Sequence, residues 1–332
     1  MNPSANPGDP PTEFTVRAVS LDDAEAIADL VNECMVAEIG IPWTEVEETR
    51  DDLTAPGRDG GADDALLLTG DGRPVGYLAL YAHSPPFTEM EAISYVIPSL
   101  WGRGLNAWLL RLGESRARAK VGLAPPGERV VLRTARFADN EPARRLFESL
   151  EFSYVRTFWM MRIELAEAPP DPQVPAGIDV RTFRRGEDDQ AVYAALAEAF
   201  ADHWGGPFPP FDEWRHLAVD GAGSGFDPAL WFLAVDGDVV VGAALCRAST
   251  PRDPDAAQVN DLAVRREWRG RGIGLALLHA AFQEFHRREI PRAELAVDAE
   301  NTTGATRLYE RAGMNVAYSW EFWEKELRPA AG

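Results

Sequence analysis

Apolar and polar residues alternate along this chain in two recurring patterns. Short apolar runs predict strands, and apolar residues spaced at i, i+3 and i+4 predict amphipathic helices. Both halves predict the same series: an opening strand and helix, then a strand, a glycine turn, a helix, a strand, a helix and a closing strand. The predicted elements occupy 15–34, 92–100, 107–120, 129–137, 139–152 and 153–165 in the first half, and 179–200, 259–268, 275–289, 292–300, 300–314 and 315–327 in the second.

This correspondence predicts a duplication of a whole domain. The turns WGRGLN and RGRGIG lie 168 residues apart, and the proline-rich stretch AEAPPDPQVPAG between the halves is typical of a linker. The start of the chain is rich in Pro, Asn and Gly, which favours disorder. We therefore predict a disordered tail at 1–12, a first domain at 13–165, a linker at 166–177 and a second domain at 178–328.

Each turn places glycines between a strand and a helix. Glycine permits a positive φ and a close approach of the backbone to a ligand. The helix N-terminus adds free N–H groups and a partial positive charge, so the pattern predicts a pyrophosphate site. It lacks the Lys-Ser/Thr of the Walker A loop, and it is not the dinucleotide-binding GxGxxG.

The second turn and its surroundings resemble the GNAT superfamily of N-acetyltransferases. VNDLAVRREWRGRGIGLALL contains the superfamily's Arg-x-x-Gly-x-Gly pattern after a strand, and ENTTGATRLYERAGM contains its later Asn and Leu-Tyr. The resemblance covers nearly the whole chain and is greatest to the branch of fused units that includes mycothiol synthases. It implies an α/β fold of two tandem GNAT domains, each a mixed, largely antiparallel twisted sheet flanked by helices.

The resemblance also implies a site and a reaction. Acetyl-CoA would be the co-substrate, without a metal, and the acceptor would be a primary amine of an antibiotic, a polyamine or a cysteinyl pseudo-disaccharide. Tyr309 would protonate the departing thiolate, because the reference pKa of a thiol, near 8.5, lies within about 1.5 units of that of Tyr. The implied cofactor-binding residues are Leu262, Ala263, Val264, Arg269, Gly270, Arg271, Gly272, Ile273, Gly274, Leu275 and Asn301.

The strand before the turn also holds the candidate general base. Its apolar positions at 259, 262 and 264 break strict alternation, which predicts a β-bulge. Relatives often place a Glu on this strand, but Gln258 and Asn260 stand at the corresponding positions. Asp261 is the nearest carboxylate, with Asp298 behind it. Asp261 would take the proton of the amine; alternatively, it caps or braces the bulge.

The acceptor side is expected near Asp202, His203 and Trp204. For His203, a packed or surface role is the alternative interpretation. The aromatic residues in this region fit either a wall of the substrate site or the core of their own loop. They are Trp204, Phe208, Phe211 and Trp214.

The first copy is predicted to be a degenerate partner that supports the second. Gly102, Gly104 and Asn140 are retained, so weak CoA binding stays possible. Compared with the second copy, the first copy lacks three features: the arginine of the turn, the last glycine of the turn and the tyrosine hydroxyl. Trp101, Asn106 and Phe147 stand where the second copy has Arg269, Gly274 and Tyr309.

Composition limits the classes of molecule that the protein is expected to bind. The formal net charge of −20 disfavours nucleic acid and anionic membranes and favours cations such as amines, although an acidic proteome would give the same charge. We expect a cytoplasmic monomer or homodimer, with Cys34 and Cys246 as buried reduced thiols. The alternatives to small-molecule acetylation are a non-catalytic acyl-CoA sensor and an acetyltransferase acting on protein N-termini or lysines.

Overall fold

The computed structural model divides the chain into two compact units. Unit 1 comprises Met1–Thr157 and Trp320–Gly332, and unit 2 comprises Phe158–Ser319. The structure describes residues 8, 10–55, 58, 63–82, 85–201, 204, 208–220, 226–250, 253–301 and 304–331.

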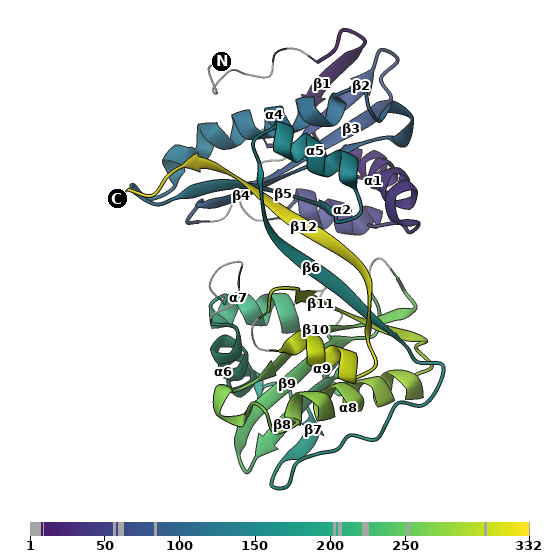
Figure 1. The fold of residues 1–332 in the computed structure, drawn as a ribbon, viewed down its shortest axis with the longest axis vertical. Coiled ribbons are helices and arrows are strands. Elements are labelled where there is room, and N and C mark those ends of the chain that lie inside the picture. Colours follow the sequence, from purple (N-terminus) through teal and green to yellow (C-terminus); the bar gives the residue numbers. More distant parts are fainter. Residues whose placement is uncertain are drawn as a thin grey trace. The chain divides into compact units, whose positions relative to one another are not determined.

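Unit 1 contains the predicted series of strands and helices (Figure 1). Its elements are β1 (Phe14–Ala18), η1 (Leu21–Asp23), α1 (Ala24–Ile39), α2 (Val46–Leu53), β2 (Ala65–Thr69), β3 (Pro74–Tyr81), β4 (Glu89–Val96), η2 (Pro98–Leu100), α4 (Leu105–Lys120), η3 (Val121–Leu123), β5 (Val130–Phe137) and α5 (Glu141–Ser149).

The second half repeats the series. Its elements are β6 (Ser153–Glu164), β7 (Asp179–Thr182), α6 (Asp189–Phe200), α7 (Phe211–Arg215), η4 (His216–Asp220), η5 (Pro228–Leu230), β8 (Trp231–Asp236), β9 (Val239–Arg247), β10 (Ala256–Val264), η6 (Arg266–Trp268), α8 (Ile273–Arg287), β11 (Arg292–Asp298), α9 (Ala305–Arg311) and β12 (Asn315–Arg328).

Each unit contains a mixed, mainly antiparallel sheet with helices packed on it, which confirms the α/β prediction. The strand order is β1-β2-β3-β4-β5-β12 in unit 1 and β6-β11-β10-β9-β8-β7 in unit 2. In the described parts of both sheets, the parallel pair is formed by corresponding strands, β4 with β5 and β10 with β11. The two glycine turns follow β4 and β10, so both lie at the end of a strand of the parallel pair.

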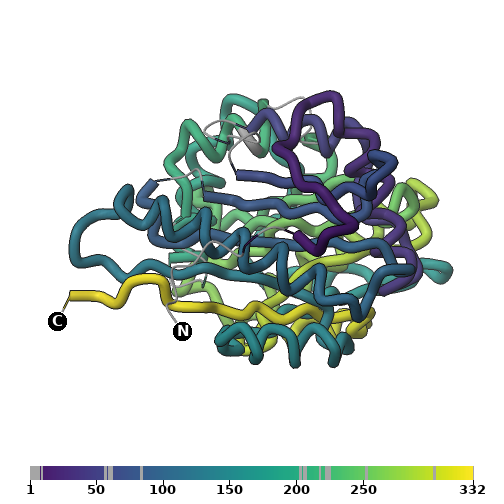
Figure 2. Tube along the Cα trace, turned by 90° about the horizontal axis from the view of Figure 1, so that it is seen from above, coloured from purple at the N-terminus to yellow at the C-terminus, as the bar shows by residue number. Residues whose placement is uncertain are grey.

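The closing strands do not stay with the half of the sequence that precedes them. β6 pairs antiparallel with β11 over Phe158–Glu164, inside unit 2. β12 pairs with β5 over Trp320–Arg328, inside unit 1, where the yellow C-terminal strand runs beside it (Figures 1 and 2). The compact units therefore differ from the linker-based boundaries, because the chain enters unit 2 before the linker and leaves it before its own end.

Unit 2 has two hydrophobic cores, one on each face of its sheet. Successive residues of β8 alternate between them: Phe232 packs in the core that includes Leu277 of α8, and Leu233 packs in the core that includes Leu196 of α6. The period of two along a strand produces this division. Helices α6 and α7 thus cover the face opposite to α8 and α9.

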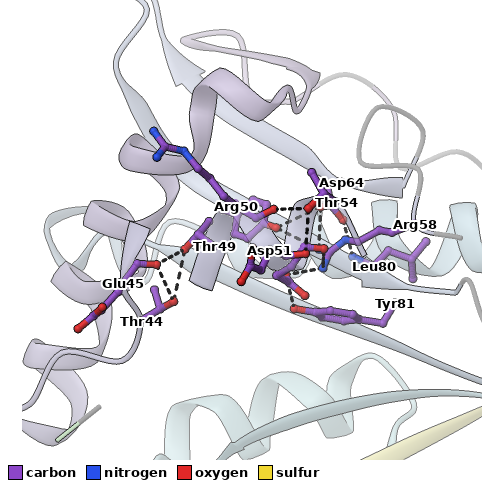
Figure 3. Close-up of polar contacts among 12 residues, drawn as sticks. Thr44, Glu45, Thr49, Arg50, Asp51, Thr54, Arg58, Asp64, Leu80 and Tyr81 are labelled. Atoms are coloured by element: carbon purple, nitrogen blue, oxygen red, sulfur yellow. Dashed lines mark hydrogen bonds and ion pairs between the residues drawn. The ribbon is translucent and has the colours of Figure 1, made fainter. Parts of the chain in front are cut away.

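Unit 1 contains a buried polar cluster beside α2 (Figure 3). The fully buried Arg58 guanidinium donates to Asp64 at 2.8 Å and also pairs with Asp52. Asp64 accepts further hydrogen bonds from the Tyr77 hydroxyl and the Leu80 amide. These partners compensate the cost of burying the two charges, and they fasten the segment after α2 to strands β2 and β3.

Candidate active site

Strand β10 contains the predicted bulge. Val259 pairs with Cys246 of β9, and Asp261 pairs with the next residue, Leu245, so Asn260 is the extra residue on β10. Such a bulge bends its strand and increases the local twist. Beyond it, β10 continues beside β9 and no longer beside β11.

A gap opens between β10 and β11 as a result. Their parallel pairing covers Ala256–Gln258 with Arg292–Glu294 and extends no further in the described stretch 253–301. The backbone of β10 from Leu262 to Val264 pairs with β9 on one side. Its other edge faces the gap, where an extended ligand can add to it as a strand would.

The glycine turn ends at the N-terminus of α8. Gly270 and Gly272 have φ of 75° and 90°, and Gly272 is the N-cap. No side chain caps this end in the structure, so its backbone N–H groups point to an anion site. A Cβ on Gly274 would come within 3.0 Å of Leu308, so a larger residue there requires the leucine to move.

Arg269 binds the protein itself. Its Nε donates to the carbonyl of Val264 at 2.9 Å and its Nη2 to that of Ala199 at 3.3 Å. In unit 1 the Trp101 indole N–H donates to the carbonyl of Val96 at 2.7 Å, which is the corresponding bond. Trp101 therefore replaces Arg269 in holding the turn to the end of its strand, but it carries no charge for a phosphate.

The turn and the gap open into one cleft of about 620 Å³. It brings together both predicted catalytic residues, all the predicted cofactor-binding residues except Arg271, and Trp204. Its lining includes Phe158, Ala199, Phe200, Trp204, Phe208, Pro209, Val259, Asn260, Asp261, Leu262, Ala263, Val264, Trp268, Arg269, Gly270, Gly272, Ile273, Gly274, Leu275, Leu295, Ala296, Val297, Asp298, Asn301, Gly304, Ala305, Leu308, Tyr309 and Arg311.

Asp261 and Tyr309 are the titratable pair of this cleft. Burial raises the pKa of Asp261 to about 6, although part of its side chain is accessible through the cleft. Burial and the nearby Asp261 carboxylate raise the pKa of Tyr309 to about 12. A carboxylate with a pKa just below neutral pH is suited to accept a proton. The raised pKa of Tyr309 keeps the phenol protonated, but it separates Tyr309 from the reference pKa of a thiol by more than the about 1.5 units expected from the sequence.

Gln258 has a different environment. Its Oε1 accepts from Arg247 Nε at 3.0 Å, and it is an amide without a basic site at neutral pH. Asp298 lines the same cleft and accepts from the Glu300 amide at 2.9 Å. Asp261 is thus the cleft carboxylate on the bulged strand itself.

The aromatic residues of this region divide between the two expected roles. Trp204 and Phe208 line the cleft. Trp214 is buried in the core on the α6 face, and Phe211 packs against that core. Of the other acceptor-side residues expected from the sequence, Asp202 and His203 lie outside the described residues.

Phe158 of β6 is a cleft residue that sequence reasoning missed. Phe158 belongs to the first half of the sequence, but it pairs with Asp298 of β11 in unit 2. No local pattern distinguishes a closing strand that stays in its unit from one that crosses to the other. The ring of Phe158 contacts that of Trp204, and their centroids lie 5.9 Å apart.

The corresponding strand of unit 1 is regular. β3 and β4 keep one register from Gly76–Val96 to Tyr81–Glu91, without the extra residue of β10. Parallel pairing of β4 with β5 covers Glu89–Glu91. The described pairing of β3 with β4 in unit 1 therefore lacks the bulge that interrupts the pairing of β9 with β10.

Side chains also occupy the unit 1 positions. The Asn106 side chain accepts from Ser94 of β4 at 3.0 Å. Asn140 donates to Glu38 at 2.6 Å and caps its own helix. Phe147 is fully buried where unit 2 has Tyr309. The first copy thus keeps the architecture and uses its distinctive residues for packing.

The described residues offer neither a metal site nor a membrane-spanning helix. No group of three or more His, Cys, Asp or Glu side chains is arranged to hold a metal ion. Among the described helices, none has the length and apolar composition to cross a membrane.

In each unit, a pair of parallel strands separates beside a helix whose N-cap is glycine. This arrangement, present in both units, defines a tandem acyltransferase architecture. The model of the Acetyltransferase (GNAT) family matches residues 25–152 and 190–314. The chain belongs to this family; it is an N-acetyltransferase built from two GNAT domains, and such enzymes use acyl-CoA.

Several relatives match this chain over most of both sequences. The chain is 32% identical to a mycothiol acetyltransferase of Geodermatophilus obscurus over 89% of this chain and 92% of that protein. It is 31% identical to one of Streptomyces coelicolor over 93% and 94%. A GCN5-related N-acetyltransferase from Sphaerobacter thermophilus is 36% identical, with a TM-score of 0.83 over 97% of this chain and 98% of that one. A tandem GNAT protein from the clavulanic acid biosynthesis pathway, 19% identical, shares the fold with a TM-score of 0.69.

CoA affinity tests the position of the cofactor. Replacing Arg269 and Gly272 together with Ala removes the bonds that hold the turn and introduces a Cβ at φ 90°. We expect CoA binding to weaken at least about tenfold in calorimetry, because strain at such a residue costs roughly 1–2 kcal/mol. The matched control replaces Trp101 and Gly104, which has φ 79°, and should leave the affinity unchanged. Unaltered affinity in the first variant would place the cofactor elsewhere.

Proposed function

We propose that unit 2 transfers the acetyl group of acetyl-CoA to a primary amine of a small molecule. The observation that carries the proposal is the cleft of unit 2, where an open bulged strand, a glycine-capped helix, Asp261 and Tyr309 line one space. The relatives named mycothiol acetyltransferases support acetyl transfer to a small acceptor.

The turn and the gap account for cofactor binding. The pyrophosphate would receive backbone N–H groups at the start of α8, where the helix dipole favours negative charge. The pantetheine arm would add to the free edge of β10 between Leu262 and Val264, as a strand does. Asn301, at the rim of the cleft, would fix the arm.

Asp261 would prepare the nucleophile. An alkyl amine with a pKa of about 10.4 is protonated at neutral pH, which withholds its lone pair at a cost of roughly 4–5 kcal/mol. With a pKa of about 6, Asp261 is ionised at pH 7 and can accept that proton, directly or through a water. The free amine then attacks the acetyl carbonyl.

The remaining steps use the strand and the phenol. As the carbonyl becomes tetrahedral, a backbone N–H at the bulge would stabilise the oxyanion. The carbon–sulfur bond then breaks, and the CoA thiolate takes a proton from Tyr309, whose pKa of about 12 keeps it protonated until this step. The nitrogen loses its second proton as it becomes an amide nitrogen, and that proton returns the Tyr309 phenolate to its neutral form, directly or through a water, while the proton on Asp261 leaves to solvent. The products are the acetamide and free CoA thiol.

The pH dependence of kcat/KM tests the base. Because Asp261 must be ionised, we expect activity to rise with pH through an apparent pKa near 6 and to be lost as pH falls below it. Asp261→Asn should remove this limb and lower kcat about 10²-fold or more. Release of free CoA thiol measures both, and Asp298→Asn is the matched comparison. An unchanged limb near pH 6 in Asp261→Asn would exclude Asp261 as the base.

A further inference from the structure

Apolar side chains form one wall of the cleft. They come from β6, the end of α6 and the segment after it: Phe158, Ala199, Phe200, Trp204, Phe208 and Pro209. Every aromatic ring among them is half-buried, so each keeps a surface open. We call this set the aromatic wall; residues 202, 203 and 205–207, which lie near it in sequence, are outside the described residues.

Contacts within the protein hold the wall in shape. Phe200 stacks on Phe208 with ring centroids 5.9 Å apart and planes at 16°. Tyr193 of α6 contacts Phe208 and donates its hydroxyl to the carbonyl of Pro209 at 3.1 Å. These contacts order the wall without a ligand. The binding of a flat ligand therefore costs little conformational entropy in the protein.

Part of the wall packs on the α6 face of the sheet. Phe200 and Phe208 pack with the core on that face, whereas Tyr309 packs with the core on the α8 face. The cofactor turn at the start of α8 occupies one end of the cleft. The wall begins beside that turn, where the carbonyl of Ala199 accepts a hydrogen bond from Arg269, and it also includes Phe200, Trp204 and Phe208 in the same cleft.

The described lining of the cleft contains the carboxylates of Asp261 and Asp298 and the guanidinium groups of Arg269 and Arg311. Asp261 and Asp298 supply carboxylates beside the gap, and none of the described wall residues is charged. Arg269 is at the turn, where backbone carbonyls engage its guanidinium. A cationic amine would thus find its counter-charge at the bulge and an apolar surface beyond it.

We propose that the acceptor is an arylalkylamine, in which a short arm joins the primary amine to a flat aromatic body. Its ring would stack on Trp204 and Phe208 while its nitrogen reaches Asp261. This proposal rests on acetyl transfer in unit 2 and specifies its substrate class.

A comparison of simple amines as substrates tests this proposal. With acetyl-CoA saturating, kcat/KM is measured by thiol release for phenethylamine, tryptamine, glucosamine and spermidine. We expect the two aromatic amines to exceed glucosamine by about 100-fold, from stacking and burial of one ring. Efficient turnover of glucosamine or spermidine at the aromatic rate would overturn the aromatic acceptor and leave acetyl transfer intact.

Variants of the wall separate recognition from catalysis. Trp204→Ala should raise the KM for phenethylamine about tenfold and leave the KM for acetyl-CoA unchanged, and Trp204→Phe should restore most of the loss. Trp101→Ala, which removes an exposed indole from unit 1, is the matched control. An unaltered KM in Trp204→Ala would overturn the role of the wall.

Binding distinguishes failure of this proposal from failure of the proposed reaction. If no amine is acetylated, phenethylamine is titrated calorimetrically into the full chain saturated with CoA. Binding that Trp204→Ala weakens would support the wall as an aromatic-amine site and overturn the catalysis. Absence of binding would overturn the wall.

Discussion

Replacing Tyr309 with phenylalanine is expected to lower kcat by about 10²–10⁴, the usual contribution of a general acid. The variant loses one hydroxyl and keeps the ring that packs against the α8 core. The affinity for CoA should therefore stay nearly unchanged. Steady-state release of free CoA thiol measures the rate, and calorimetry measures the affinity.

Unit 1 supplies the matched control for Tyr309. Phe147→Tyr adds a phenol at the corresponding helix, but β4 is unbulged and Asn106 bonds to Ser94. We expect no new activity from that substitution, alone or added to Tyr309→Phe. A Tyr309→Phe enzyme within threefold of the native rate would show that the phenol only packs.

A chain that begins at Ile178 is expected to be largely insoluble and inactive. It lacks β6, which pairs with β11 along that strand's whole length, from Arg292 to Asp298. The exposed edge of β11 would invite pairing with other chains. The truncation also deletes Phe158 from the cleft and leaves Trp320–Arg328 without β5 as its partner.

The fragment Phe158–Ser319 is the comparison for this truncation, because it contains the whole of unit 2. It should yield a larger soluble fraction than the Ile178 chain and bind CoA, as centrifugation and calorimetry would measure. Full solubility and full activity of the Ile178 chain would contradict the contribution of β6 to unit 2.

Local chemistry made much of the site predictable. Glycines between a strand and a helix indicated the turn at Gly270 and Gly272, and both have the expected positive φ. The broken alternation at 259, 262 and 264 indicated the bulge, which the pairing of Val259 and Asp261 confirms. These features depend on the residues within a few positions, so the sequence contains them.

The rest depends on contacts between distant segments. The pattern of β6 predicts a strand but not which sheet it joins, so Phe158 could not be assigned to the cleft of unit 2. The roles of Trp204 and Trp214 were open for the same reason: one lines the cleft and the other lies in the core. Roles of Tyr309, Asp261 and Asn301 in the reaction stay predictions.

The exchange of closing strands sets an order of assembly during synthesis. Unit 2 is one continuous stretch, Phe158–Ser319, and it is translated before Trp320. Unit 1 waits for Trp320–Arg328, the partner of β5. Domains commonly fold from the N-terminus onward as they emerge. Here the first unit to be translated is the last to be completed, and until then the open edge of β5 needs protection from other nascent chains.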